Sequence, residues 1–193
     1  DNMGGWRVED TYPPAEQDWI RFGMDECSII GGGETITSSS ELRIECPFFE
    51  EETRIVGTPT FHVDATVSLF STSGHLFVEM IQSSNEMHLG HAVMDLRFHA
   101  GGKDGEILSP GETVNAKMEF FGMDVLIPAG DGIQLIITQT GEDYVPSPVS
   151  TQSVTLGLGE TSILSLSTVS RNCDDLFMPP MMTDSYPQCI VED

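Results

Sequence analysis

Apolar and polar side chains alternate with a period of two over much of this chain, and that pattern decides what it can fold into. The clearest run has apolar residues at every second position from Phe61 to Leu69, with polar residues such as Asp64 between them. A period of two places the apolar side chains on one face of a β-strand. Further alternating or apolar stretches occupy residues 75–82, 92–99, 114–120, 125–138, 154–158 and 163–169.

Glycine, serine and proline clusters separate these stretches, for example at residues 71–74 and 101–105. Such clusters are typical of turns. The sequence shows no convincing amphipathic helix. Many short strands at regular spacing predict an all-β fold, a β-sandwich or jelly roll. We expect this sandwich to occupy residues 27–170, after an irregular N-terminal lead-in (1–26) and before a C-terminal tail (171–193).

The charge balance limits the partners. The sequence has 31 Asp and Glu residues against 8 Lys and Arg, a formal net charge of −23. An acidic surface repels nucleic acid and anionic membranes, so we expect neither as a partner. No apolar run approaches the roughly 20 residues that cross a bilayer, so no membrane insertion is expected. The charge predicts a marine or halophilic source, because salt screens the self-repulsion. An acidic secreted protein without a salt requirement is the alternative.

Four cysteines lie in two local pairs, one near each end of the chain. Four cysteines allow three connectivities. We expect the disulfides Cys27–Cys46 and Cys173–Cys189, because each closes a short segment rich in turn residues, and the second would staple the C-terminal tail. Disulfides imply an extracellular or secreted location, with the cell surface also open. The chain opens on Asp1 without a charged-then-apolar leader, which predicts a mature or excised form. Zinc is the weaker reading of the cysteines, because no Cys-x-x-Cys occurs.

Calcium is the metal that the composition allows. Jelly-roll modules often hold a structural calcium through carboxylates and loop carbonyls. The candidate ligands are the aspartates in predicted loops, namely Asp104, Asp131, Asp143, Asp174 and Asp175. No EF-hand spacing is present, and in so acidic a chain some carboxylates cluster by chance. No other cofactor is expected.

Five stretches, in order along the chain, carry a resemblance to a known family. They are Trp6-Arg7-Val8-Glu9-Asp10-Thr11-Tyr12-Pro13-Pro14, Gly57-Thr58-Pro59, Ser73–Ile81, Leu108–Val114 and Ala129–Leu135. Together they resemble the C-terminal part of the X-prolyl dipeptidyl peptidases and cocaine esterase-like serine hydrolases. Two departures stand out. Asp131-Gly132 replaces the His-Arg that is usual in the family, and Tyr12 stands where Trp is usual.

The resemblance implies a non-catalytic C-terminal domain with a jelly-roll β-sandwich fold of the galactose-binding-domain-like type. In such enzymes the jelly roll packs on an upstream α/β-hydrolase domain, helps to shape access to the active site, and can mediate oligomerisation. That domain is therefore the expected partner, with a homo-oligomer also open. An α/β-hydrolase needs a Gly-x-Ser-x-Gly nucleophile elbow. The sequence contains none, so we assign no catalytic residue.

Two other classes of function fit the same fold. Jelly rolls also serve as free-standing carbohydrate- or calcium-binding modules, usually with aromatic side chains exposed on a sheet. Here Trp6 and Trp19 both lie in the lead-in, which weakens that reading. A structural extracellular subunit that assembles through its edge strands is the other class. His88 and His91 are interpreted as solvated histidines at strand ends.

Overall fold

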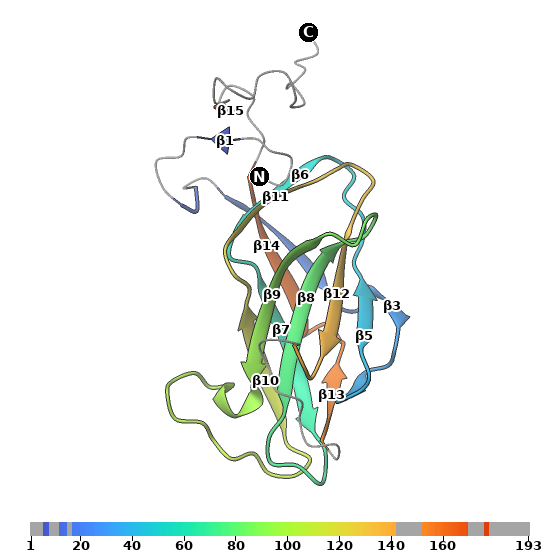
Figure 1. Cartoon of the computed structure of the whole chain (residues 1–193), viewed down its shortest axis with the longest axis vertical. Coiled ribbons are helices and arrows are strands. Elements are labelled where there is room, and N and C mark those ends of the chain that lie inside the picture. Colours follow the sequence, from blue (N-terminus) through green and yellow to red (C-terminus); the bar gives the residue numbers. More distant parts are fainter. Residues whose placement is uncertain (1–5, 8–11, 15–16, 142–151, 170–175, 178–193) are drawn as a thin grey trace.

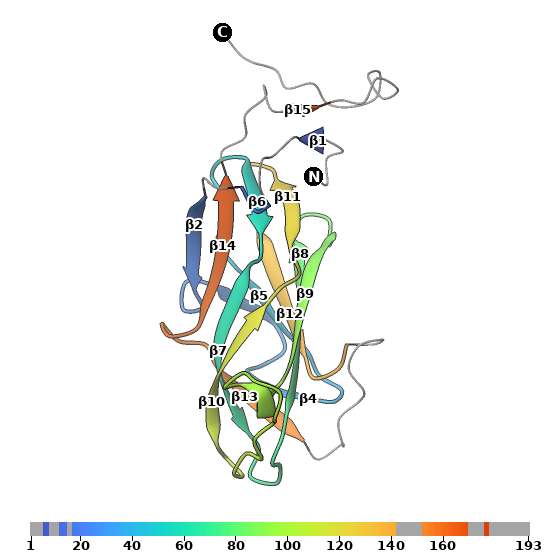
Figure 2. The same ribbon diagram turned by 90° about the vertical axis from the view of Figure 1, so that its left-hand side faces the viewer.

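A computed structural model describes residues 6–7, 12–14, 17–141, 152–169 and 176–177. Within these ranges the chain forms strands and one short 3-10 helix, η1 (Leu96–Phe98). Two antiparallel sheets pack face to face, and a further strand pair stands apart (Figure 1; Figure 2). The predicted all-β sandwich is confirmed. None of the described helical structure is long and apolar enough to cross a membrane.

One sheet has five strands in the order β3-β5-β12-β8-β9. Their bounds are β3 (Ser28–Gly31), β5 (Leu42–Glu45), β8 (His75–Gln82), β9 (His88–Asp95) and β12 (Ile133–Thr138). In the middle of this sheet, Leu135 pairs with Ile44 on one side and with Met80 on the other. All three side chains are buried, so this row belongs to the inner face.

The other sheet has eight strands, and several of them are halves of longer, broken strands. Its order is β11-β6-β14-β7-β13-β4, with β10 paired to β7 and β2 paired to β14. The bounds are β2 (Asp18–Gly23), β4 (Thr35–Thr37), β6 (Thr53–Gly57), β7 (Thr60–Val67), β10 (Thr113–Glu119), β11 (Met123–Ile127), β13 (Ser153–Gly157) and β14 (Ile163–Val169).

The break between β6 and β7 has a local cause. Gly57 has a φ of +104°, a conformation that glycine adopts at low cost and other residues avoid. Pro59 follows directly and supplies no backbone N–H to the sheet. The Gly57-Thr58-Pro59 segment therefore bends the strand, and the long alternating run begins only at Thr60.

The core lies between the inner faces of the two sheets. On β7, Phe61, Val63 and Ala65 have no exposed surface, whereas His62 and Asp64 between them are half-buried on the opposite face. Burial of apolar surface contributes about 25 cal/mol per Å² and is the main force that holds the two sheets together. Each sheet therefore keeps one outer face that the sandwich itself does not cover.

The lead-in is irregular only in part. β2, which lies within it, pairs with β14 from Asp18 to Gly23, and its Ile20 packs against the core. Further upstream, the Tyr12 hydroxyl donates a hydrogen bond of 2.8 Å to the backbone oxygen of Met123. Because β2 contributes both to the ladder and to the core, the sandwich begins before residue 27.

The outer face of the eight-stranded sheet is shielded from solvent at the end formed by β6 and β11. Arg54 is only 4% exposed. Its Nε donates to Oδ1 of Asp124 at 2.9 Å and its Nη2 to Oδ2 at 2.7 Å, the two-pronged geometry in which guanidinium and carboxylate pair best. Val56 and Leu126 point away from the core cluster and yet are buried. Pro13 lies against Gly57 at this same end, so the lead-in helps to cover it.

The lead-in also meets the C-terminal tail. β1 (Trp6–Arg7) pairs antiparallel with β15 (Leu176–Phe177). Both views place this pair beyond the end of the sandwich that carries β6 and β11 (Figure 1; Figure 2). Two segments about 170 residues apart in sequence are thus neighbours in the structure.

One disulfide lies within the described ranges. It joins Cys27, directly before β3, to Cys46, directly after β5. The sequence spacing predicts this pairing, and the bond fastens the edge strand β3 to its neighbour. The second expected pair, Cys173–Cys189, lies outside the described residues.

Asp131 organises the turns at one end of the five-stranded sheet. Its carboxylate accepts hydrogen bonds from the side chains of Gln82 and Ser84, at 2.7 and 2.5 Å, and from the backbone N–H groups of Ser84 and Gly132, at 3.0 and 2.8 Å. Burial alone would raise the pKa of this carboxyl. The hydrogen bonds outweigh burial, so the pKa lies below its ordinary value.

We predict that Asp131→Asn lowers the free energy of unfolding by about 1–3 kcal/mol at pH 7, the cost of unpaired buried groups. A depressed pKa gives stability that is present above the ordinary carboxyl pKa and lost as pH falls through the folded value. The difference between wild type and variant, measured by urea unfolding, should therefore shrink below about pH 4. Asp104→Asn, in an exposed loop, is the matched control; equal losses in both variants would contradict the assigned role.

Candidate functional site

The sequence itself points to no catalytic residue. It lacks a nucleophile elbow. In the part of the chain that the structure describes, no three His, Cys, Asp or Glu side chains are placed to hold a metal ion together. Strand register brings polar side chains together on the two outer faces of the sandwich.

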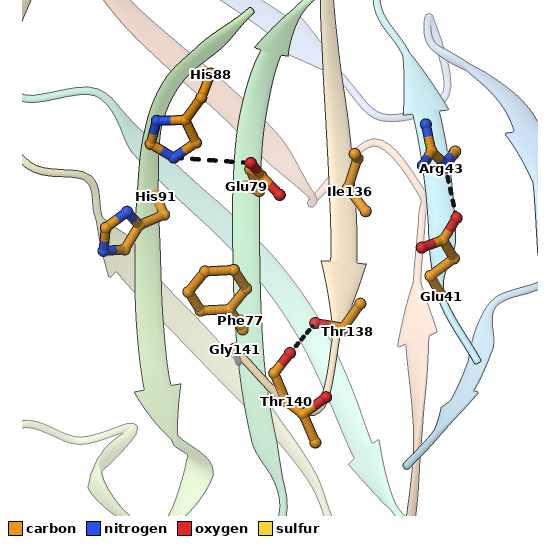
Figure 3. Close-up of a pocket in the computed structure, with 10 residues that line it drawn as sticks. All are labelled: Glu41, Arg43, Phe77, Glu79, His88, His91, Ile136, Thr138, Thr140 and Gly141. Carbon is orange, nitrogen blue, oxygen red and sulfur yellow. Dashed lines mark hydrogen bonds and ion pairs between the residues drawn. The ribbon is translucent and has the colours of Figure 1, made fainter. Parts of the chain in front are cut away.

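A hollow of about 410 Å³ lies on the outer face of the five-stranded sheet (Figure 3). Strand register assembles it. Ile136 of β12 lies between Arg43 of β5 and Glu79 of β8, and Glu79 in turn lies beside His91 of β9. We call it the histidine hollow, and it is lined by Glu41, Arg43, Phe77, Glu79, His88, His91, Ile136, Thr138, Thr140 and Gly141.

Charged groups ring the apolar floor of the histidine hollow. Arg43 Nε donates to Glu41 at 2.7 Å. This hydrogen bond raises the pKa of the Arg43 guanidinium and outweighs burial, which acts to lower it. The negative charges of Glu41, Glu86 and Glu79 raise it further. On the other side, His88 Nε2 lies 3.8 Å from Glu79 Oε1. The hollow thus offers carboxylate, guanidinium and imidazole groups to a small polar ligand.

Aromatic rings form one wall of the histidine hollow. His91 stacks on Phe77 with ring centres 5.4 Å apart, and Phe121 meets it edge-on at 5.1 Å. After β12 the chain passes directly over the Phe77 ring. Gly141 lies so close to this ring that a side chain at its position would collide with it. His91 is therefore packed among rings rather than solvated at a strand end, whereas the His88 side chain is half exposed.

A second hollow, of about 370 Å³, lies on the outer face of the eight-stranded sheet. Here β2, β14, β7 and β10 lie side by side. Arg21 pairs with Ser165, and His62 pairs with Ile163 on one side and Lys117 on the other. We call it the Trp19 face, and it is lined by Trp19, Arg21, Thr60, His62, Lys117, Ile163 and Ser165.

The Trp19 face carries an exposed aromatic side chain beside two cationic ones. The Trp19 side chain is 52% exposed, a large fraction for an indole. Burial lowers the pKa of His62, and the positive charge of Lys117 lowers it further. Lys117 lies 3.6 Å from Glu119. Two cationic side chains and a histidine thus gather beside an exposed tryptophan on a chain whose net charge is −23.

The structure describes two of the five predicted calcium ligands, Asp104 and Asp131. Asp104 lies in an exposed loop. The oxygens of Asp131 accept hydrogen bonds from within the protein. Asp143, Asp174 and Asp175 lie outside the described residues. Calcium binding therefore stays a prediction.

Both outer-face hollows went unpredicted from the sequence. The residues of each hollow come from strands that are far apart in the chain, so only the register between paired strands brings them together. The strands concerned are β5, β12, β8 and β9 for the histidine hollow, and β2, β14, β7 and β10 for the Trp19 face. One signal was available. His62 lies on the polar side of an alternating run whose other side is wholly apolar, and this alternation predicts that the His62 side chain faces outward.

The described residues form a β-sandwich, and the sequence contains no nucleophile elbow. A family model described as the X-Pro dipeptidyl-peptidase C-terminal non-catalytic domain matches residues 25–175. The chain belongs to this family. A putative Xaa-Pro dipeptidyl-peptidase of Streptomyces avermitilis is 34% identical over 68 residues, which is 35% of this chain and 10% of that protein.

Several solved hydrolases contain a similar fold. A CocE/NonD family hydrolase from Staphylococcus aureus matches with a TM-score of 0.64 at 10% identity, over 84% of this chain and 39% of its own. An aminopeptidase from a marine sediment Thaumarchaeota archaeon gives 0.55 at 11% identity, over 86% and 36%. An α-amino acid ester hydrolase gives 0.53 at 10%, over 84% and 34%. The chain thus spans less than half of each of these proteins, and such identities show a shared fold.

We predict that Lys117→Gln raises the pKa of His62, because it removes the positive charge that disfavours the imidazolium. The measurement is a ¹H–¹³C NMR titration of the histidine Cε1–H signals. Lys103→Gln makes the same charge change in an exposed loop and should leave His62 unchanged. An unchanged or lower pKa of His62 in Lys117→Gln would contradict the geometry of the Trp19 face.

Proposed function

We propose that this chain is the β-sandwich domain of an extracytoplasmic serine hydrolase of the X-Pro dipeptidyl-peptidase type, and that it packs on the α/β-hydrolase domain of that enzyme. The observation that carries the proposal is the family match over residues 25–175. The structural match to the Staphylococcus aureus hydrolase supports the proposal. This chain covers 39% of that hydrolase, so the rest of such a protein has room for a catalytic domain.

In this role the sandwich supplies surface rather than chemistry. A rigid domain beside a catalytic domain narrows the approach to the active site and selects substrates by shape, and it can also hold subunits together. The rigid two-sheet core suits that role, because the outer faces keep a fixed geometry. The parent enzyme would form an acyl-enzyme on a serine supplied by the other domain.

An extracytoplasmic location agrees with the Cys27–Cys46 disulfide, because thiols in the cytosol are kept reduced. The strong negative charge agrees with it as well, since it keeps a protein soluble in a salty medium.

The purified 193-residue chain should release no chromophore from an X-Pro-p-nitroanilide or a p-nitrophenyl ester, because it lacks the nucleophile elbow. The control is the full-length hydrolase, which should turn over one of these substrates. Saturable turnover by the isolated chain would overturn its non-catalytic role.

A second candidate function, carbohydrate binding, is favoured by the histidine hollow. Carboxylate, guanidinium and hydroxyl groups on a sheet face offer hydrogen bonds to the hydroxyls of a sugar, and this hollow has all three in Glu79, Arg43 and Thr138. A glycan array with the isolated chain tests it. Binding that is lost in both Arg43→Gln and Glu79→Gln would support the lectin-like function, and an array without hits would contradict it.

A further inference from the structure

We propose that the Trp19 face is the surface through which this domain docks on its hydrolase domain, and that its partner surface presents a carboxylate to Arg21. The inference rests on the proposed function and names the contact that the proposed function requires. It is drawn from charge, from an unpaired guanidinium and from the place of β2 in the fold.

Charge singles out the Trp19 face. The outward positions of β2, β14, β7 and β10 carry Arg21 and Lys117 against Asp64 and Glu119, which balance, while the whole chain has a net charge of −23. The rest of this face is mainly Thr and Ser. A partner surface that presents carboxylates is repelled least by a face where the charges cancel.

The two anchors on the Trp19 face are suited to an interface. Tryptophan and arginine carry the largest share of binding energy in protein contacts. The Arg21 guanidinium has no hydrogen-bond or ion-pair partner among the described residues. By contrast, Arg43, Arg54 and Arg97 each pair with a carboxylate of the chain. An arginine left unpaired on so acidic a protein is available for a two-pronged contact with a carboxylate from outside.

The position of β2 supports the same partner. β2 is the first strand of the sandwich, and the lead-in before it, at Tyr12 and Pro13, covers the adjoining end of the same outer face. A domain that precedes the lead-in therefore reaches this face over the shortest path. The rival apolar side chains, Leu69, Phe70 and Ile107, are also exposed. They belong to the loops that follow β7 and η1, and these loops lie at the end of the sandwich away from β6 and β11 (Figure 2).

The two lysines of the chain provide an internal test. Lys117 lies on the Trp19 face and Lys103 lies in an exposed loop outside it. Acetylation by an N-hydroxysuccinimide ester is followed at both residues by mass spectrometry, in the isolated chain and in the full-length hydrolase. Docking should slow the reaction of Lys117 about tenfold or more, because interfaces exclude water and solutes from their centre. Lys103 should react at the same rate in both proteins.

Three results would overturn the docking face, and hydrogen exchange on the same samples tells them apart. If Lys117 reacts equally in both proteins while backbone amides elsewhere in the sandwich are protected in the full-length hydrolase, the packing stands but uses another face. If no part of the sandwich is protected, the proposed function itself fails. If Lys117 becomes protected in the isolated chain as its concentration rises, the occupant is a second copy of the chain.

A charge reversal checks the role of Arg21 directly. Arg21→Glu should return most of the Lys117 reactivity in the full-length hydrolase, because it places a carboxylate against a carboxylate. Lys103→Glu, with the same charge change away from the face, should leave Lys117 protected. The isolated variants serve as baselines and should have the melting temperature of the wild type. Full protection of Lys117 in Arg21→Glu would contradict the proposed contact.

Discussion

Each sheet of this domain has one apolar face, and the structure depends on burying those two faces against each other. Phe61, Val63 and Ala65 show the requirement at its simplest, since none of them keeps any exposed surface. Once the inner faces are joined, the outer faces are fixed in geometry and free to differ in chemistry. One end of an outer face is covered by the lead-in around Tyr12, and the remainder is left for other contacts.

The two outer faces have separate characters as a result. The five-stranded sheet carries the histidine hollow, where acidic residues surround Arg43 and rings pack around His91. The eight-stranded sheet carries the Trp19 face, where Arg21 has no partner among the described residues and the charges at the outward positions of the four strands balance. A domain that docks through one outer face and keeps the other in solvent would show such a difference between its two faces. The family to which the chain belongs is described as non-catalytic, which agrees with a role in docking.

The sequence was sufficient for the fold and for one disulfide. The alternating run on β7 identifies its buried side chains directly, and local spacing identifies the Cys27–Cys46 bond. The sites on the outer faces could not be predicted from the sequence, because they depend on the register between strands that are distant in the chain. Asp131 shows the same limit. Its place in a loop suggested a calcium ligand, but its hydrogen bonds to Gln82 and Ser84 appear only in three dimensions.

The central claim is that this sandwich belongs to a serine hydrolase whose chemistry resides in another domain. The most direct measurement is labelling of the active full-length hydrolase with a fluorophosphonate, followed by identification of the modified peptide. The account predicts a single adduct on a serine outside these 193 residues, at a nucleophile elbow. An adduct on a serine within them, with loss of activity in step with labelling, would contradict it.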